Sequence, residues 1–314
     1  MIMAKKGKIV IARYLAGDAV KALEKDFEVI MNPEIRGVGR DILRRQIQDA
    51  DALITSGDEI DREMLKDAKK LKVIADAWGG RGIDREACKE KGIEVRSSRI
   101  PINWINYTEA EHALMMMMAV GRGLLKQDAF VRSGYYSNYE EANQDFLGFG
   151  LYGKMLGILG GGFWSGDELT RRARALGMTV HYWDLGQSKA VEDEGALYME
   201  KDELIRTSDY IVVMNNQYRG YLLDEEEFSM MKPECILVNV TRGNLIHEEA
   251  LVEALAKGEL AGAGLDKFEN EPEMNPGLEK LNNCILSPHS DGALLPERNR
   301  ILQDAIEQCL EVLG

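Results

Sequence analysis

The 314-residue sequence has little of what several classes of protein require. Its four cysteines, Cys88, Cys235, Cys284 and Cys309, are scattered and form no C-x-x-C pair. We therefore expect buried thiols in a reducing cytosol, hence a cytoplasmic protein, rather than disulfides or a metal site. No apolar run approaches the ~20 residues of a membrane helix. The N-terminus, MIMAKKGKIVIARYLAG, lacks the long apolar core and the cleavage site of a signal peptide.

Positive charge is also scarce. The chain has 39 Lys and Arg against 53 Asp and Glu, a formal net charge of −14. Nucleic acids and anionic membranes bind clustered cations, so we expect neither as a partner, while a locally basic pocket for an anionic metabolite is compatible with this charge. The content of 45% hydrophobic and 29% charged residues is ordinary for a globular protein. Its length exceeds what one core usually holds, which predicts two domains.

Short apolar runs rich in Val and Ile alternate with helical patterns along the chain, which predicts parallel sheets with helices on both faces. The expected strands are residues 9–14, 27–31, 52–55, 71–77, 93–96, 155–159, 179–184, 210–215, 235–240, 261–266 and 283–287. The expected helices include residues 18–25, 39–49, 62–68, 106–125, 167–176 and 297–313, and residues 132–150 read as a surface excursion. We predict two α/β domains, the second beginning near residue 105. Periodicity does not say which domain the last helix joins.

A glycine-rich stretch, GILGGGFWSG at residues 157–166, lies between a predicted strand and a predicted helix. Counted from Gly160, the dinucleotide pattern G-x-G-x-x-G includes Gly162 and requires a third glycine at position 165. That position is Ser165, and the glycine follows one residue later at Gly166. We interpret the stretch as a cofactor loop with a three-residue tip, in which Gly160 forms the turn, Gly162 allows close approach and Gly166 contacts the strand.

An acidic residue supports this interpretation. Asp184 ends the next predicted strand, 24 positions after Gly160. In dinucleotide-binding folds, the acid that binds the ribose of NAD lies about 20 residues after the glycine loop. A carboxylate there repels a 2′-phosphate, so NAD rather than NADP is the expected cofactor. The alternative is a tight glycine turn with Asp184 as a solvated strand end.

Three further motifs lie where predicted strands end. They are VNVTRG with Arg242, GLDKFENEP with Glu271 and LSPHS with His289. Taken alone, each residue has a structural explanation. Arg242 could form a surface ion pair, Glu271 could be solvated and His289 could cap a helix. Ligands of open α/β sheets gather at the carboxyl ends of strands, however, so the three are expected together. Arg242 can bind two oxygens, such as those of a carboxylate and a carbonyl, through its planar fork, and His289 can protonate a developing alkoxide. Glu271 would orient His289 and stabilise its imidazolium, while nicotinamide supplies the hydride.

The chain resembles the D-isomer-specific 2-hydroxyacid dehydrogenase family over most of its length. The resemblance is carried by LKVIADAWGGRGIDREACKEKGIEV, AEHAL, GKMLGILGGG, RRARALGM, MMKPECILVNVTRGNLIHEEALVEAL, GAGLDKFENEP and LSPHSDGA. It implies a Rossmann-type cofactor domain, residues 105–290, inserted in a flavodoxin-like substrate domain made of residues 1–104 and completed by 291–314. It also implies NAD as cofactor and a homodimer that pairs through the cofactor domain.

The resemblance further implies roles for single residues, with Asp266 beside the nicotinamide carboxamide and Val240 and Thr241 along the cofactor. The predicted cofactor-binding residues are Gly160, Gly162, Trp164, Ser165, Gly166, Asp184, Asn215, Val240, Thr241 and Asp266. The predicted substrate-binding residues are Trp78, Gly79, Gly80 and Arg81. The sequence departs from the family at Arg81, where an Asp is usual, and at Glu109, where an apolar residue is common. It departs also at residues 213–220, a short segment without the family's proline.

We therefore predict an NAD-dependent D-2-hydroxyacid dehydrogenase that transfers a hydride between NAD(H) and a small 2-hydroxy or 2-oxo acid. Two alternatives stay open: a non-catalytic NADH-sensing regulator on the same fold, and a dehydrogenase of a small anion such as formate or phosphite. Arg81 beside Arg242 would suit a substrate with a second anionic group, unless Arg81 pairs at the surface with Asp84 or Glu86. The apolar helix with the run MMMM at residues 115–118 fits a dimer interface or a monomer core.

Overall fold

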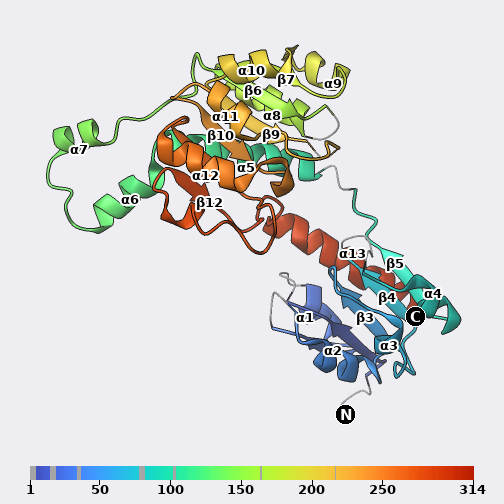
Figure 1. Cartoon of the computed structure of the whole chain (residues 1–314). Coiled ribbons are helices and arrows are strands. Elements are labelled where there is room, and N and C mark those ends of the chain that lie inside the picture. The colour runs from blue at the N-terminus through green and yellow to red at the C-terminus, as the bar shows by residue number, and fades with distance from the viewer. Residues whose placement is uncertain are drawn as a thin grey trace. The chain divides into compact units, whose positions relative to one another are not determined.

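The computed structural model describes residues 5–14, 19–33, 37–77, 82–101, 104–162, 165–215 and 217–314, with residues 141–143 described by their backbone. The chain divides into two compact units (Figure 1). Unit 1 comprises residues 1–101 and 293–314, and unit 2 comprises residues 102–292. None of the helices in the described part of the chain is long and apolar enough to cross a membrane.

Unit 1 contains a parallel five-stranded sheet of order β2-β1-β3-β4-β5. Its central strands are buried on both faces, as expected for a parallel sheet covered by helices. The strands are β1 (Lys8–Ile11), β2 (Glu28–Met31), β3 (Ala52–Thr55), β4 (Val73–Asp76) and β5 (Glu94–Ser97), and the helices between them are α1 (Ala19–Leu23), α2 (Arg40–Ile47), α3 (Arg62–Leu65) and α4 (Arg85–Glu90).

The last helix, α13 (Leu295–Leu313), packs on the sheet of unit 1 (Figure 1). Its buried residues Leu302, Ala305 and Ile306 join the core formed with α1, and α2, α3 and α4 cover the opposite face. Asp304 of the same helix accepts hydrogen bonds from the Arg99 backbone N (2.8 Å) and guanidinium Nε (2.7 Å) beyond β5. The helix that periodicity left unassigned therefore belongs to the unit that begins the chain.

Unit 2 is built on seven parallel strands of order β12-β11-β10-β9-β6-β7-β8. They are β6 (Met155–Gly160), β7 (Thr179–Trp183), β8 (Leu197–Tyr198), β9 (Tyr210–Met214), β10 (Ile236–Asn239), β11 (Gly262–Leu265) and β12 (Cys284–Leu286). From β6 the chain first proceeds to one edge of the sheet and then returns to β9 at the other side of β6. Ligands of open α/β sheets bind at such a switch point, beyond the carboxyl ends of the strands.

Helices cover both faces of this sheet (Figure 1). One face carries α5 (Trp104–Gly121), α8 (Gly166–Ala175) and α9 (Lys189–Asp193), and the other carries α10 (Lys201–Thr207), α11 (Glu225–Met230) and α12 (Glu248–Lys257). Two short 3-10 turns, η1 (Gly243–Leu245) and η2 (Leu278–Lys280), follow β10 and precede β12. The helices α6 (Leu124–Arg132) and α7 (Tyr139–Asp145) extend away from these layers (Figure 1).

The predicted fold class, two doubly wound parallel-sheet α/β domains, is confirmed. Two local predictions differ from the structure. The helix expected over residues 106–125 is two helices, because Gly123 adopts the left-handed backbone (φ 60°) between α5 and α6. Strand β1 ends at Ile11, and Arg13 beyond it turns to an ion pair with Asp58. The predicted surface excursion at residues 132–150 contains the helix α7.

Candidate active site

The glycine loop follows β6 at the switch point of unit 2. Gly160 and Gly161 have φ values of 95° and 91°, a region that suits glycine. A Cβ on Gly160 would lie 2.6 Å from the Cβ of Asn215, and one on Gly166 would lie 2.6 Å from the carbonyl O of Gly161. The loop therefore packs backbone against backbone on the first turn of α8. Gly160 forms a turn, as the sequence predicted, while the contact of Gly166 is made with Gly161.

Asp184 at the end of β7 faces this loop and is nearly buried. Its carboxylate accepts hydrogen bonds from Gly162 N (2.9 Å), Leu185 N (2.7 Å) and Asn215 Nδ2 (3.2 Å). Asp184 is thus no solvated strand end. It joins two other residues of the predicted cofactor set, Gly162 and Asn215, into one cluster.

The extra residue of the loop has a partner on another helix. The hydroxyl Oγ of Ser165 donates to Oε2 of Glu109 in α5 at 2.5 Å, and both residues are buried. The serine in the glycine pattern and the acid in the apolar helix, which are separate departures in the sequence, therefore form one hydrogen bond in the structure. It fastens the tip of the loop to α5.

The ends of β9 and β10 are joined by side chains of the predicted cofactor set. Asn215 Oδ1 accepts hydrogen bonds from Gln217 N (2.8 Å) and Tyr218 N (2.6 Å). Thr241 Oγ1 donates to Val213 O (3.2 Å), and Val240 is fully buried in the core. These side chains are occupied in shaping the strand ends, so a ligand lying across them would meet mainly backbone.

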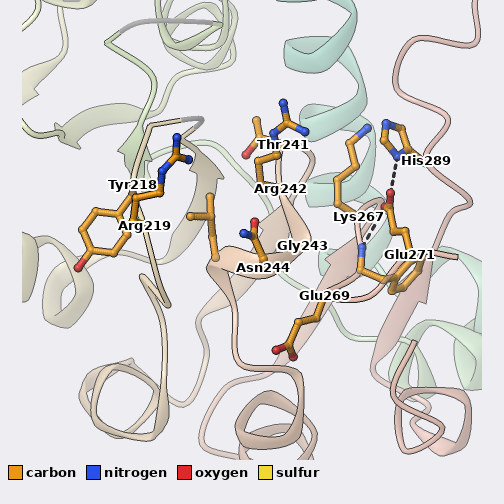
Figure 2. A pocket seen from close by; sticks show the side chains of 12 residues that line it. Tyr218, Arg219, Thr241, Arg242, Gly243, Asn244, Lys267, Glu269, Glu271 and His289 are labelled. Atoms are coloured by element: carbon orange, nitrogen blue, oxygen red, sulfur yellow. Dashed lines mark hydrogen bonds and ion pairs between the residues drawn. The ribbon is translucent and has the colours of Figure 1, made fainter. Parts of the chain in front are cut away.

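A cavity of about 500 Å³ opens beyond β10 and β11. Among the residues that line it are Tyr218, Thr241, Arg242, Lys267, Glu271 and His289 (Figure 2). The structure thus brings together in one cavity the three residues that the sequence predicted as catalytic, although Arg242 lies 47 positions before His289.

His289 is held by Glu271 within this cavity. Its Nδ1 lies 2.8 Å from Glu271 Oε2, and Glu271 Oε1 accepts a hydrogen bond from Phe268 N (3.1 Å). Because a carboxylate only accepts hydrogen bonds from a neutral or charged imidazole, Nδ1 carries the hydrogen and Nε2 is left for a ligand. The His289 backbone has φ 53°, the left-handed region that residues with side chains rarely adopt.

Asp266 lies under His289 and is completely buried. Its Oδ1 accepts hydrogen bonds from Ser287 Oγ (2.5 Å) and Ser290 N (2.8 Å), its Oδ2 accepts one from Asp291 N (3.1 Å), and His112 Nε2 lies 3.2 Å from Oδ1. Burial alone would raise the pKa of Asp266, but the hydrogen bonds from His112, Ser287 and Ser290 outweigh it and hold the pKa well below its usual range. The carboxylate that resemblance assigned to the nicotinamide carboxamide is thus already surrounded by protein donors.

Three residues near the cavity escaped the sequence reasoning: His112, Lys267 and Asp291. Lys267 Nζ lies 2.5 Å from Asp291 Oδ1 and 3.4 Å from Asp266 Oδ2, with all three side chains buried. The sequence did carry signals for them, since His112 lies within AEHAL and Lys267 follows Asp266 at the end of a predicted strand, in GLDKF. Nothing in the sequence, however, indicated which charge lies opposite Lys267.

Trp164 and the predicted substrate loop, Trp78, Gly79, Gly80 and Arg81, lie outside the described residues. Within the described part of the chain, no group of three His, Cys, Asp or Glu side chains is arranged to hold a metal ion. The four cysteines are free, and burial raises the pKa of the Cys235 and Cys309 thiols to about 12.

Comparison with known proteins agrees with this architecture. The NAD binding domain of the D-isomer specific 2-hydroxyacid dehydrogenases matches residues 114–290, and the catalytic domain of the same family matches residues 9–99. A glyoxylate reductase of Pyrococcus furiosus is 36% identical over 95% of this chain and 90% of its own. One from Thermococcus litoralis is 37% identical over 92% and 88%.

Among solved structures, a protein of Thermus thermophilus superposes with a TM-score of 0.79 at 32% identity, covering 98% of this chain and 96% of its own. Domain matches, overall identity and fold all agree. The chain therefore belongs to the D-isomer specific 2-hydroxyacid dehydrogenase family and is an NAD-dependent enzyme that transfers a hydride between NAD(H) and a 2-oxo or 2-hydroxy acid.

Proposed function

We propose that the protein reduces glyoxylate, or a 2-oxo acid of similar size, with Arg242, Glu271 and His289 as the catalytic residues. The observation that carries the proposal is the 2.8 Å contact between His289 Nδ1 and Glu271 Oε2 in the cavity that Arg242 also lines. The names of the relatives at 36% and 37% identity support glyoxylate as substrate.

The roles follow from the chemistry of each side chain. Arg242 binds the carboxylate through its planar fork and polarises the neighbouring carbonyl. NADH, when bound, supplies the hydride to the carbonyl carbon. His289 Nε2 gives its proton to the alkoxide oxygen as the negative charge develops there. Glu271 orients the ring through Nδ1 and stabilises the imidazolium before the proton leaves.

The chain's residues fit a dinucleotide. Gly160 and Gly166 let the loop pack closely on Asn215 and on its own backbone, and the loop leads directly into the first turn of α8, where backbone amides can bind a pyrophosphate. We propose that Gly162 and Ser165 belong to the same pyrophosphate site and that Asp184 accepts hydrogen bonds from the adenosine ribose. Further proposed contacts along the cofactor come from Trp164, Asn215, Val240, Thr241 and Asp266.

We further propose that residues 105–290 bind the cofactor and that residues 1–104 with 291–314 supply the substrate loop Trp78, Gly79, Gly80 and Arg81. The descriptions of the two matched domains, NAD binding and catalytic, support this division. A net charge of −14 argues against nucleic acid and membrane as partners. Four free cysteines favour a cytoplasmic location.

The proposal is tested by NADH oxidation with glyoxylate, pyruvate and a dianionic 2-oxo acid, and by NAD⁺ reduction with formate and phosphite. We expect glyoxylate to have the highest kcat/KM. His289→Ala should lose about 10²–10⁴-fold in kcat with NADH binding retained, and Arg242→Ala should raise KM as well. Turnover of formate or phosphite above that of every 2-oxo acid would contradict the proposal, as would parental kcat in His289→Ala. NADH binding without any turnover would favour a regulator.

A homodimer is the proposed assembly. The arm formed by α6 and α7 presents apolar side chains to solvent, and Met115 and Met118 on α5 are also exposed. Exposed apolar patches of this kind mark interfaces. The exposed residues of the arm include Leu124, Leu125, Val131, Tyr135, Tyr136 and Tyr139. Light scattering at micromolar concentration should give twice the mass of the 35.2-kDa chain, and Leu124→Glu/Leu125→Glu should lower it. A monomer mass for the parent would refute the proposal.

A further inference from the structure

An ion pair is buried directly beneath the turn that carries His289. Lys267 Nζ lies 2.5 Å from Asp291 Oδ1, and the two side chains are only 4% and 8% exposed. Buried charges are costly to desolvate, and an apolar pair of similar volume is often at least as stable. Fold stability is therefore a weak explanation for this pair.

The pair ties the end of β11 to the turn of residues 287–291. Lys267 follows Asp266 at the end of the strand, and Asp291 comes two residues after His289. Asp266 holds the same turn from below: its carbonyl O accepts a hydrogen bond from His289 N (3.0 Å), and its carboxylate accepts those from Ser290 N and Asp291 N. His289 is thus held on its own backbone and on the residues that follow it.

The turn needs such support because His289 has φ 53°. A non-glycine residue keeps a left-handed backbone only when its surroundings determine it, and such residues cluster at functional sites. Relaxation of this backbone would rotate the imidazole away from Glu271, whose carboxylate is itself fixed by Phe268 N.

We propose that Lys267 and Asp291 are positioning residues for the proton transfer: their ion pair holds the turn so that His289 meets both Glu271 and the substrate. The inference rests on the proposed function, in which His289 is the proton donor. Lys267 acts through the turn and through its charge. Figure 2 shows the side chains of Arg242, Lys267 and His289 ending on the same side of the cavity.

The charges of Lys267 and Asp291 should affect the pH–rate profile, which a merely structural role would leave unchanged. The charged or titratable groups around the turn are Lys267 and Arg242, the carboxylates of Asp266, Asp291 and Glu271, and His112 beside Asp266. Removing the Lys267 charge makes the surroundings more negative and favours an imidazolium, which moves the midpoint of the pH–rate profile upward. Removing the Asp291 charge moves the midpoint downward.

The experiment compares Lys267→Met, Asp291→Asn and the double variant with the parent holoenzyme. Each single variant should lose about 10- to 100-fold in kcat, as expected when a catalytic group is misplaced, with the Kd of NADH within about threefold of the parent. The midpoint of kcat/KM against pH should rise by about half a unit in Lys267→Met and fall by a similar amount in Asp291→Asn. The double variant should return to the parental midpoint while its kcat stays below that of the parent.

Lys257→Met is the matched control. It breaks an ion pair with Glu253 of similar length (2.9 Å) that is exposed on α12, and it should change neither kcat nor the pH profile. Shifts of the same sign in both single variants, or parental kcat and midpoint in both, would overturn the proposal. If the single variants do not fold, the double variant decides, because it leaves no unpaired buried charge between the two positions. Parental kcat in that variant would overturn the positioning role.

Failure of this inference is distinguishable from failure of the proposed function. If His289→Ala turns over like the parent, the acid–base role is wrong and the positioning argument fails with it. If His289→Ala is inactive while Lys267→Met equals the parent in kcat and pH profile, only the role of Lys267 is wrong.

Discussion

Replacing Gly166 by alanine should weaken NADH binding, because the first turn of α8 touches the backbone of the glycine loop. The added Cβ would lie 2.6 Å from the carbonyl O of Gly161 and 2.8 Å from its carbonyl carbon, where ordinary contact begins at 3.4 Å. The loop backbone must therefore move away from α8 by about 0.8 Å, because it has no side chain there that could rotate aside.

The size of the effect follows from two opposing contributions. Overpacking of this kind costs about 1–3 kcal/mol, whereas alanine in a helix is about 0.5–1 kcal/mol better than glycine. We therefore expect a net loss of up to about 2.5 kcal/mol in the free energy of unfolding. The same movement displaces the amides proposed to hold the pyrophosphate. Loss of one charge-assisted hydrogen bond, about 1.5–3 kcal/mol, would raise the Kd of NADH about 10- to 100-fold.

Fluorescence titration with NADH and thermal unfolding of the same samples measure both effects. Gly150→Ala is the matched control in the same unit, since a Cβ there meets open space at a backbone conformation open to other residues, and it should leave both quantities unchanged. NADH binding of parental strength in Gly166→Ala would refute the reasoning, because the close contact between loop and helix would then not shape the cofactor site.

Three further predictions concern cofactor choice, acid stability and substrate charge. The parent should prefer NADH to NADPH, and Asp184→Ala should narrow that preference in kcat/KM; a parent that prefers NADPH would contradict the role of Asp184. Burial alone would raise the pKa of Asp304, but hydrogen bonds from Arg99 lower it below its ordinary value. A lowered folded-state pKa stabilises the fold above the unfolded value of about 3.9 and ceases to do so as the pH falls through the folded value. Urea unfolding of Asp304→Asn should therefore show a loss of stability at about pH 7 that becomes smaller at about pH 3. An equal loss at both pH values would contradict the argument. Arg81→Ala should lose about 1.5–3 kcal/mol of transition-state stabilisation on a dianionic 2-oxo acid and little on a monoanionic one; equal losses would leave Arg81 without a direct role.

The order of residues along the chain was sufficient for the fold class. Parallel strands are buried on both faces, so they appear as short continuous apolar runs, and the amphipathic stretches between them have nowhere to pack except on those sheets. Strand ends are local features too. Arg242, Glu271 and His289 each follow such a run, and their common edge was predictable because parallel strands end on the same side of a sheet.

Pairings between distant residues were not predictable in this way. The apolar stripe of α13 suits either sheet, and its place on unit 1 is set by contacts such as Asp304 with Arg99, 205 positions away. The sequence predicted that Gly166 would contact the strand, yet the backbone that Gly166 touches is that of Gly161 in the loop.

The buried charges show the same limit. Glu109 stands where an apolar residue is common, and Lys267 was not singled out in the sequence. The buried partner of each lies elsewhere in the chain. Ser165 is 56 positions from Glu109, and Asp291 is 24 positions from Lys267. A periodic pattern records only which face of its own helix or strand a residue occupies. Burying a charge is compensated by atoms within about 3–4 Å, and those distances exist only after the helices have packed and the loops beyond the strands have closed.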